Sequence, residues 1–277
     1  MKTVLLPCGE RVPALGQGTW NMGDDPSARA DELAALRLGL DLGMTLIDTA
    51  EMYGEGLSES LVGEAIAGRR DEVFLVSKVY PHNASRRAMR KSCEASLRRL
   101  RTDRLDLYLL HWAGSVPFAE TLEAFASLQR DGLIRHFGVS NLDLADMREL
   151  ADLPGGAKVQ TDQLLYNLTR RGIEHDLLPW LRERRVPVMA YSPIEQGRLA
   201  ADKRLSKFAA RHGMTPAQVA LAWLVAQEGV VAIPKTGSRV RVEENAQALA
   251  RPLTPEQLAE LDALFPPPQG PSPLEML

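Results

Sequence analysis

The chain of 277 residues has little cysteine, and Cys8 and Cys93 are the only two. So few thiols argue against a disulfide scaffold, and neither cysteine has the spacing to other ligand residues that a metal site requires. We therefore expect a protein of a reducing compartment, the cytoplasm, with no resident metal.

Long apolar runs and an excess of one charge are also missing. No run approaches the about 20 apolar residues of a membrane span, and the apolar start of the chain is short and broken by Pro7. The formal net charge is −3, and no basic stripe marks a surface for nucleic acid or lipid headgroups. With 45% hydrophobic and 25% charged residues, the composition is that of a soluble globular protein, for which we expect a monomer.

What the sequence does contain is an alternation of short apolar runs with helical patterns. The runs predict eight strands, at 14–20, 45–48, 73–78, 105–110, 134–139, 159–165, 187–191 and 230–233. Helical patterns follow them at 27–41, 58–67, 85–101, 118–131, 144–151, 173–185, 202–212, 215–228, 240–249 and 254–265.

This alternation predicts an α/β fold with a parallel sheet that is buried on both faces. Eight such units predict a (β/α)8 TIM barrel formed by residues 1–277 as a single domain, with two extra helices and a short N-terminal hairpin at 3–6 and 11–13. A flavodoxin-like or Rossmann sheet would leave the last units unexplained, and no Gly-x-Gly-x-x-Gly motif opens a helix. The proline-rich stretch 266–273 is expected to run extended over the surface.

Polar or aromatic residues end all eight apolar runs. Any one of them has an ordinary explanation, such as a turn residue or a surface lysine. In a closed barrel, however, the carboxyl ends of the strands converge on one rim, where barrel enzymes hold their active sites. The residues at these ends are Thr19-Trp20, Asp48 with Tyr53, Ser77-Lys78, His111-Trp112, Ser140-Asn141, Gln163, Tyr191-Ser192 and Pro234-Lys235.

The order and spacing of these stretches resemble the aldo-keto reductase family from about Leu15 to Asn245. The matching stretches are Gly18-Thr19-Trp20, Leu46-Ile47-Asp48-Thr49-Ala50, Tyr53-Gly54, Ser77-Lys78, Leu109-Leu110-His111-Trp112, Gly138-Val139-Ser140-Asn141, Ala190-Tyr191-Ser192-Pro193 and Ile233-Pro234-Lys235. The segments around Met52 and Tyr80 are most similar to bacterial members that act on methylglyoxal and other small aldehydes.

The resemblance implies a catalytic tetrad of Asp48, Tyr53, Lys78 and His111. A carbonyl that receives hydride develops negative charge on oxygen and must be protonated, and Tyr53 would be the proton donor. Lys78 would lower the pKa of Tyr53, Asp48 would keep Lys78 charged, and a neutral His111 would orient the carbonyl oxygen.

The hydride must come from a cofactor, because no side chain donates one, and the resemblance implies NADPH in preference to NADH. The family match assigns the nicotinamide to Ser140, Asn141, Gln163 and Tyr191, with Gly18 and Thr19 nearby. The loop Ser192 to Leu199, with Gly197, would cover the pyrophosphate, although its acidic Glu195 departs from the usual neutral loop. The 2′-phosphate would lie against Lys235, Thr236, Ser238 and Arg241, and the adenine against Glu244 and Asn245.

The expected substrate is a small carbonyl compound. Trp20, Tyr80 and Trp112 would line its pocket, and the short loop after Trp112 and the short tail after Phe265 suggest an open pocket. Two other functions stay open. A cofactor-binding regulator would keep this fold and act through a protein partner, and a barrel hydrolase would use Asp48 and Glu51 as its carboxylate pair but would leave Lys78 and Tyr53 without a role.

Overall fold

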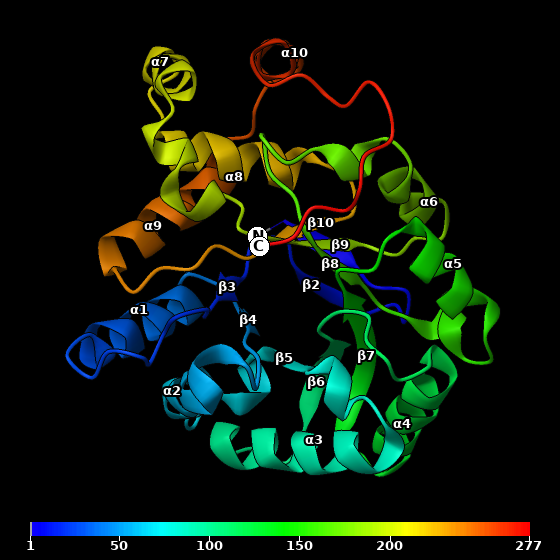
Figure 1. Ribbon diagram of the computed structural model, residues 1–277. Helices are drawn as coiled ribbons and strands as arrows, with labels where there is room; N and C mark the ends of the chain where they lie inside the picture. Colours follow the sequence, from blue (N-terminus) through cyan, green and yellow to red (C-terminus); the bar gives the residue numbers. More distant parts are fainter. Residues whose placement is uncertain (1) are drawn as a thin grey trace.

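The structure, a computed structural model, describes residues 2–277 and is a (β/α)8 barrel, as predicted. Figure 1 looks along the barrel axis, with the strands at the centre and the helices around them. Neighbouring strands are parallel and follow chain order. They are β3 (Gln17–Gly18), β4 (Leu46–Asp48), β5 (Phe74–Val79), β6 (Leu105–Leu110), β7 (Ile134–Ser140), β8 (Asp162–Leu165), β9 (Val188–Tyr191) and β10 (Val230–Ala232).

Contacts between the first and last strands close the barrel. Gly16 N donates to Ala232 O at 2.9 Å, and Gly18 N donates to Pro234 O at 3.0 Å. A Cβ atom on Gly18 would lie 2.8 Å from the carbonyl oxygen of Ile233, so only glycine allows this approach. Regular strand structure covers only Gln17–Gly18 of the predicted run 14–20, and isolated bridges join Leu15 to Ala232 in β10 and Gly18 to Lys235 beyond it.

Within residues 2–277, ten α-helices surround the strands, and their bounds lie close to the predicted ones. They are α1 (Arg29–Asp41), α2 (Leu57–Ala65), α3 (Arg86–Leu100), α4 (Phe118–Arg130), α5 (Leu144–Asp152), α6 (Leu177–Glu183), α7 (Lys203–Arg211), α8 (Pro216–Ala226), α9 (Arg239–Gln247) and α10 (Pro255–Leu264). The two extra helices are α7 and α10, which lie at the edge of the ring in Figure 1. The predicted helix 173–185 is divided, because the side chain of Asp176 caps a new start at Leu177.

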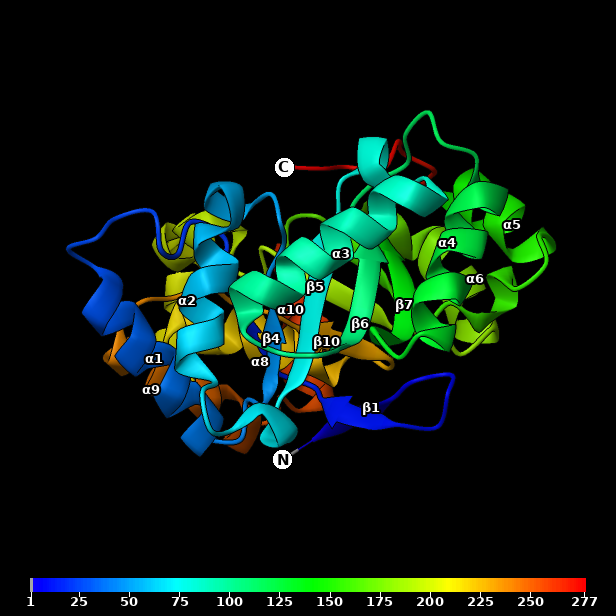
Figure 2. The same cartoon turned by 90° about the horizontal axis from the view of Figure 1, so that it is seen from below.

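The N-terminal hairpin and the C-terminal tail lie at opposite ends of the barrel. Strands β1 (Thr3–Leu5) and β2 (Arg11–Pro13) form the predicted hairpin at the end opposite the catalytic rim (Figure 2). Residues 266–277, called the tail below, are extended and run toward the barrel axis at the other end (Figure 1). Within residues 2–277, no helix has the length and apolar character needed to cross a bilayer.

The hairpin carries a side-chain cluster that was not expected from the spacing around the cysteines. Cys8 Sγ lies 3.6 Å from His136 Nε2, which lies 3.1 Å from Glu10 Oε2. In the described part of the chain, these three are the one group of metal-ligand side chains close enough to share an ion. The guanidinium of Arg135 already binds both oxygens of Glu10, at 3.0 and 2.9 Å, so the charge of this carboxylate is balanced without a cation.

Asp162, the first residue of β8, is a buried acid whose side chain has no basic or hydrogen-bonding side chain as a partner in the described part of the chain. It is fully buried, and neither carboxyl oxygen has a side-chain hydrogen-bond partner among residues 2–277. Burial raises the pKa of Asp162 well above its ordinary value, the backbone N–H of Leu142 lowers it by less, and Asp146 and Asp143 raise it further. This shift favours the protonated form of the carboxyl group in the folded state.

Replacing this acid should remove a pH-dependent loss of stability. A carboxyl group whose pKa is raised in the folded state stabilises the protein fully below its unfolded pKa of about 3.9. This stabilisation is lost as the pH rises through the folded-state pKa. The free energy of unfolding of Asp162→Asn should therefore exceed that of the unmodified chain by a margin that grows above about pH 4, by at most about 1.4 kcal/mol per pH unit. Urea unfolding across pH tests this, with the exposed Asp152→Asn as the control. A margin that does not change with pH would contradict the assignment.

Candidate active site

Three of the four predicted tetrad residues form a hydrogen-bonded group at the rim, in which Asp48 and Lys78 are buried and Tyr53 is half-buried. Lys78 Nζ lies 2.7 Å from Asp48 Oδ2 and 2.9 Å from Tyr53 Oη, and it also donates to the backbone oxygen of Thr49 at 3.0 Å. His111 lies on the other side of the phenol, with ring centroids 5.9 Å apart in an edge-on arrangement. Strands β4, β5 and β6 thus bring the four residues together.

Glycines after β4 allow Tyr53 to turn back over the rim. Tyr53 begins a short 3-10 turn in which Gly54 and Gly56 have φ angles of 56° and 91°. A Cβ atom on Gly54 would lie 2.1 Å from Asp24 Oδ1. The glycines that follow Tyr53 in the sequence are therefore needed for both the backbone conformation and the space.

The electrostatics of this group differ from the sequence-based expectation in one respect. Burial raises the pKa of Tyr53 above its ordinary value, and Asp48 adds to the rise, so that the lowering by Lys78 is outweighed. Lys78 therefore lowers the pKa of Tyr53, as expected, but the net shift is upward because burial and Asp48 outweigh this effect. Tyr53 is protonated at neutral pH and holds a proton that it can donate.

Lys78 stays charged although its side chain is fully buried. Burial alone would lower its pKa, but Asp48 and Tyr53 together raise it above the ordinary value. Burial also raises the pKa of Asp48, against the opposing effects of Lys78 and Gln163. The ammonium of Lys78 is thus held by its contacts with the carboxylate, the phenol and one carbonyl.

His111 is neutral in this site. Burial lowers the pKa of His111 to about 3, and the nearby charge of Lys78 acts in the same direction. A neutral imidazole carries one N–H group and can donate a hydrogen bond without bringing a second positive charge beside Lys78.

A cavity of about 640 Å³ opens above this group, and most of the predicted site residues line it. Lys78 lies beneath it, in hydrogen-bond contact with two of the lining residues. The predicted residues that line it are Gly18, Thr19, Trp20, Asp48, Tyr53, His111, Trp112, Ser140, Asn141, Gln163, Tyr191, Ser192, Gly197, Lys235, Thr236 and Arg241. Those that do not line it are Tyr80, Leu199, Ser238, Glu244 and Asn245.

One wall of the cavity presents amide and phenol groups. Tyr191 Oη donates to Asn141 Oδ1 at 2.9 Å, while Asn141 Nδ2 donates to Ser140 Oγ and His111 O. Asn141 and Ser192 have φ angles of 57° and 47°, unusual values that place their side chains at the rim. Burial raises the pKa of Tyr191 to about 12, so its ring is a neutral surface.

Gln163 connects this wall to the tetrad, a link that the sequence pattern did not reveal. Its Nε2 donates to Asp48 Oδ1 at 2.8 Å, so each oxygen of the carboxylate has a partner. The amide nitrogen must face the carboxylate, which leaves the amide oxygen for another donor. β8 and β4 are not neighbours in the sheet, and only the closed barrel brings these two side chains together.

The opposite end of the cavity presents cations beside a helix start. Lys235, Thr236 and Arg241 line it, and Ser238 is the N-terminal cap position of α9, although its side chain makes no capping bond. Free backbone N–H groups at a helix start and a guanidinium are both suited to bind phosphate. Glu244 and Asn245 lie further along α9, and Asn245 borders a separate small cleft with Gln17.

The loop from Ser192 to Leu199 forms the edge of the cavity, and the structure accounts for its acidic residue. The carboxylate of Glu195 is buried rather than directed into the cavity and accepts from Asn167 at 2.7 Å and from Arg170 at 2.9 Å. Burial alone would raise its pKa, but Arg170, Asn167 and Arg198 together lower it. Leu199 is also buried, so it supports the loop from below.

The structure differs from the predicted substrate pocket in two ways. Trp20 and Trp112 line the cavity, whereas Tyr80 stands behind Trp112, with ring centroids 6.0 Å apart. The short tail nevertheless reaches the pocket, because Met276 and Leu277 also line the cavity. Asn21, Met52 and Gly237 are further lining residues that the sequence did not predict. The tail has no strand-end pattern that would signal its return to the rim.

Glu51 is occupied by structural contacts and is not part of the cavity lining. One of its oxygens accepts from the backbone N–H of Tyr80 at 2.8 Å, and the other accepts from Ser92. The carboxylate pair that a hydrolase would need is therefore not assembled at this rim.

Comparisons with known proteins agree with this geometry. The family model described as "Aldo/keto reductase family" matches residues 14–265. The chain is 53% identical to methylglyoxal reductase YeaE of Escherichia coli strain K12, over 96% of this chain and 95% of that protein. It is 33% identical to the glyoxal reductase of Bacillus subtilis strain 168, over 99% and 97%. The crystal structure of an aldo/keto reductase from Klebsiella pneumoniae in complex with NADP and acetate is 50% identical, with a TM-score of 0.97 over 100% of this chain and 99% of that one. Through both its site and these matches, the chain belongs to the aldo/keto reductase family.

Proposed function

We propose that this protein reduces small aldehydes, dicarbonyls such as methylglyoxal, or ketones to alcohols with NADPH. The observation that carries the proposal is the charged Lys78 held between Asp48 and the protonated Tyr53 at the base of one cavity. The similarity to methylglyoxal and glyoxal reductases supports the choice of a small carbonyl substrate.

The cavity has the groups that a nicotinamide dinucleotide requires. Asn141 and Gln163 offer amide partners for the carboxamide, and the neutral ring of Tyr191 offers a surface for stacking. At the other end, Lys235 and Arg241 offer cations for a 2′-phosphate, which favours NADPH over NADH. When bound, NADPH supplies the hydride that no side chain can supply.

The residues of this chain would then protonate and stabilise the developing alkoxide. Tyr53 would donate its phenolic proton to the carbonyl oxygen, and the ammonium of Lys78 would stabilise the phenolate that remains. Neutral His111 would hold the carbonyl oxygen through its N–H group. Trp20 and Trp112 would cover the apolar part of the substrate.

A direct assay tests this function. Reduced-nicotinamide absorbance should fall when the protein is mixed with NADPH and methylglyoxal or an aromatic aldehyde. The kcat/KM should be at least about tenfold higher with NADPH than with NADH, because charge-assisted hydrogen bonds to the 2′-phosphate are lost with NADH. Arg241→Ala should reduce this preference. Tight NADPH binding without turnover of any aldehyde in a panel would instead favour the cofactor-binding regulator.

A further inference from the structure

Arg170 lies between two segments that border different parts of the active-site cavity. On one side, its Nε and Nη2 donate to Glu195 Oε1 at 3.1 and 2.9 Å. On the other side, its Nη1 donates to Glu275 Oε1 at 2.5 Å. Glu195 belongs to the loop Ser192–Leu199, whereas Glu275 belongs to the tail that carries Met276 and Leu277 to the cavity.

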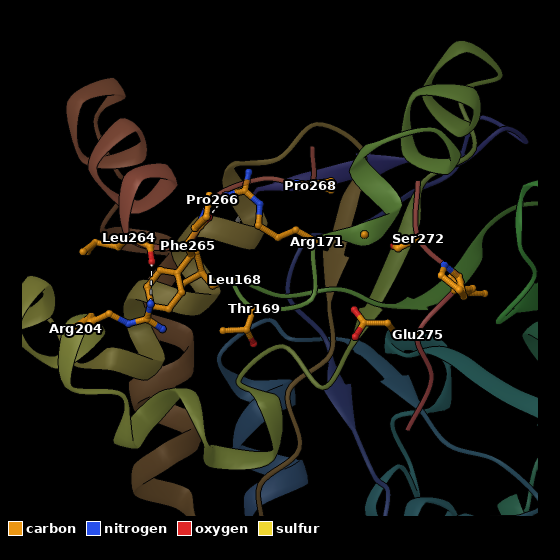
Figure 3. Close-up of a pocket in the computed structure, with 13 residues that line it drawn as sticks. Leu168, Thr169, Arg171, Arg204, Leu264, Phe265, Pro266, Pro268, Ser272 and Glu275 are labelled. Carbon is orange, nitrogen blue, oxygen red and sulfur yellow. Dashed lines mark hydrogen bonds between the residues drawn. The ribbon is translucent and has the colours of Figure 1, made fainter. Parts of the chain in front are cut away.

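The tail makes few polar contacts with the rest of the protein. Among residues 2–277, the Arg170–Glu275 contact is the one hydrogen bond between two side chains that residues 266–277 make. A cavity of about 680 Å³ lies beside Pro273, Leu274 and Glu275, and Figure 3 shows the labelled Glu275 next to it. A second cavity, of about 140 Å³, is lined by the same three residues. Within this stretch Leu274 packs against the core, so the polar contact of Glu275 acts beside an apolar one.

The loop, by contrast, is held in an unusual conformation by the side chain of Glu195. Glu195, Gln196 and Gly197 have φ angles of 50°, 53° and 89°, and the first two are not glycine. Such conformations persist only where surrounding contacts impose them. Asn167, Arg170 and Arg198 provide these contacts through the buried carboxylate. Any shift of Arg170 therefore acts on the loop as well as on the tail.

We propose that Arg170 is a positioning residue that couples the tail over the substrate to the loop over the cofactor. With the contacts to Glu195 and Glu275 both in place, Met276 and Leu277 complete the substrate wall only when the loop is in its closed position. Loss of the tail contact then loosens the loop, and loss of the loop contact displaces the substrate wall. The inference rests on the proposed function, and it takes the loop Ser192–Leu199 to cover NADPH and the tail to border the carbonyl substrate.

The sharpest test is Glu275→Gln, because Glu275 does not line the active-site cavity. The rate of NADPH release should rise about two- to fivefold, the factor that corresponds to the free energy of a partly exposed ion pair. Stopped-flow fluorescence with excess NADP as a trap measures this rate. The KM for methylglyoxal should rise by a similar factor. The matched control is Glu260→Gln on α10, whose side chain is 41% exposed, like that of Glu275, and which pairs with Arg211 instead.

A double-mutant cycle separates coupling from local loosening. In the Arg170→Gln background, Glu275→Gln should have no further effect on NADPH release. A change in KM without a change in release, an unchanged release rate, or additive effects in the cycle would each overturn the coupling. Thermal unfolding of each variant with and without NADPH shows that the fold and the cofactor site are retained. Cofactor release can be measured without turnover, so an unmodified chain that fails to bind NADPH would contradict the proposed function itself.

Discussion

Tyr53→Phe should lower kcat about 10²- to 10⁴-fold, the typical contribution of a general acid, while the Kd for NADPH stays nearly unchanged. Burial and Asp48 raise the pKa of Tyr53, so the phenol enters the reaction with its proton in place. The substitution removes that proton and keeps the ring. Lys78 retains its contacts with Asp48 and Thr49, so the site should remain folded. Steady-state kinetics and fluorescence titration with NADPH measure the two quantities.

Tyr80→Phe is the matched control for this variant. Tyr80 also lies near the rim and packs against Trp112, but it does not line the cavity. Its hydroxyl group should therefore be dispensable for turnover. Full activity in Tyr53→Phe, or an equal loss in Tyr80→Phe, would refute the assignment of Tyr53 as the proton donor.

Lys78→Met should abolish turnover and also destabilise the protein by about 3–5 kcal/mol. The fully buried ammonium is the closest partner of a buried carboxylate, at 2.7 Å, and its removal leaves Asp48 as an uncompensated charge. Turnover is lost because nothing then stabilises the phenolate that Tyr53 becomes as it gives up its proton. Urea unfolding at neutral pH and kcat/KM with methylglyoxal report the two effects.

A second substitution distinguishes the structural role of Lys78 from its catalytic role. In the double variant Asp48→Asn with Lys78→Met, no charge is left unpaired, so much of the lost stability should return. Turnover should stay at the level of the single variant. Recovery of activity together with stability would show that Lys78 only holds the site together.

The prediction of the fold succeeded where the pattern was local. Each apolar run, such as 105–110, had to be buried on both faces, and each helical pattern had a start or stop signal nearby, such as Thr215-Pro216 before α8. The prediction was poorest at 14–20, where only Gln17–Gly18 forms a regular strand. In this run the hydrogen bonds go to β10, more than 200 residues away, and no local pattern records them.

In the candidate site, too, features with a local sequence pattern could be predicted, whereas contacts between distant residues could not. Asp48, Lys78 and His111 could be placed on one rim from the ends of their strands, because parallel strands in a barrel all end on the same side. The pKa direction of Tyr53 could not be predicted, because it depends on how burial and Asp48 compare with Lys78. The role of Glu195 was equally hidden, because its partners Asn167 and Arg170 belong to another loop.

By itself, the sequence determined the barrel, the order of its strands and the chemical groups that end them, since these depend on hydrophobic period and chain direction. Only the tertiary structure decided how these groups pair: Gln163 with Asp48, Glu195 with Arg170, and the tail with the mouth of the cavity. The physical reason is that a hydrogen bond or an ion pair depends on distances of a few ångströms between residues far apart in the chain. Such distances are set by barrel closure and side-chain packing, which no local pattern contains.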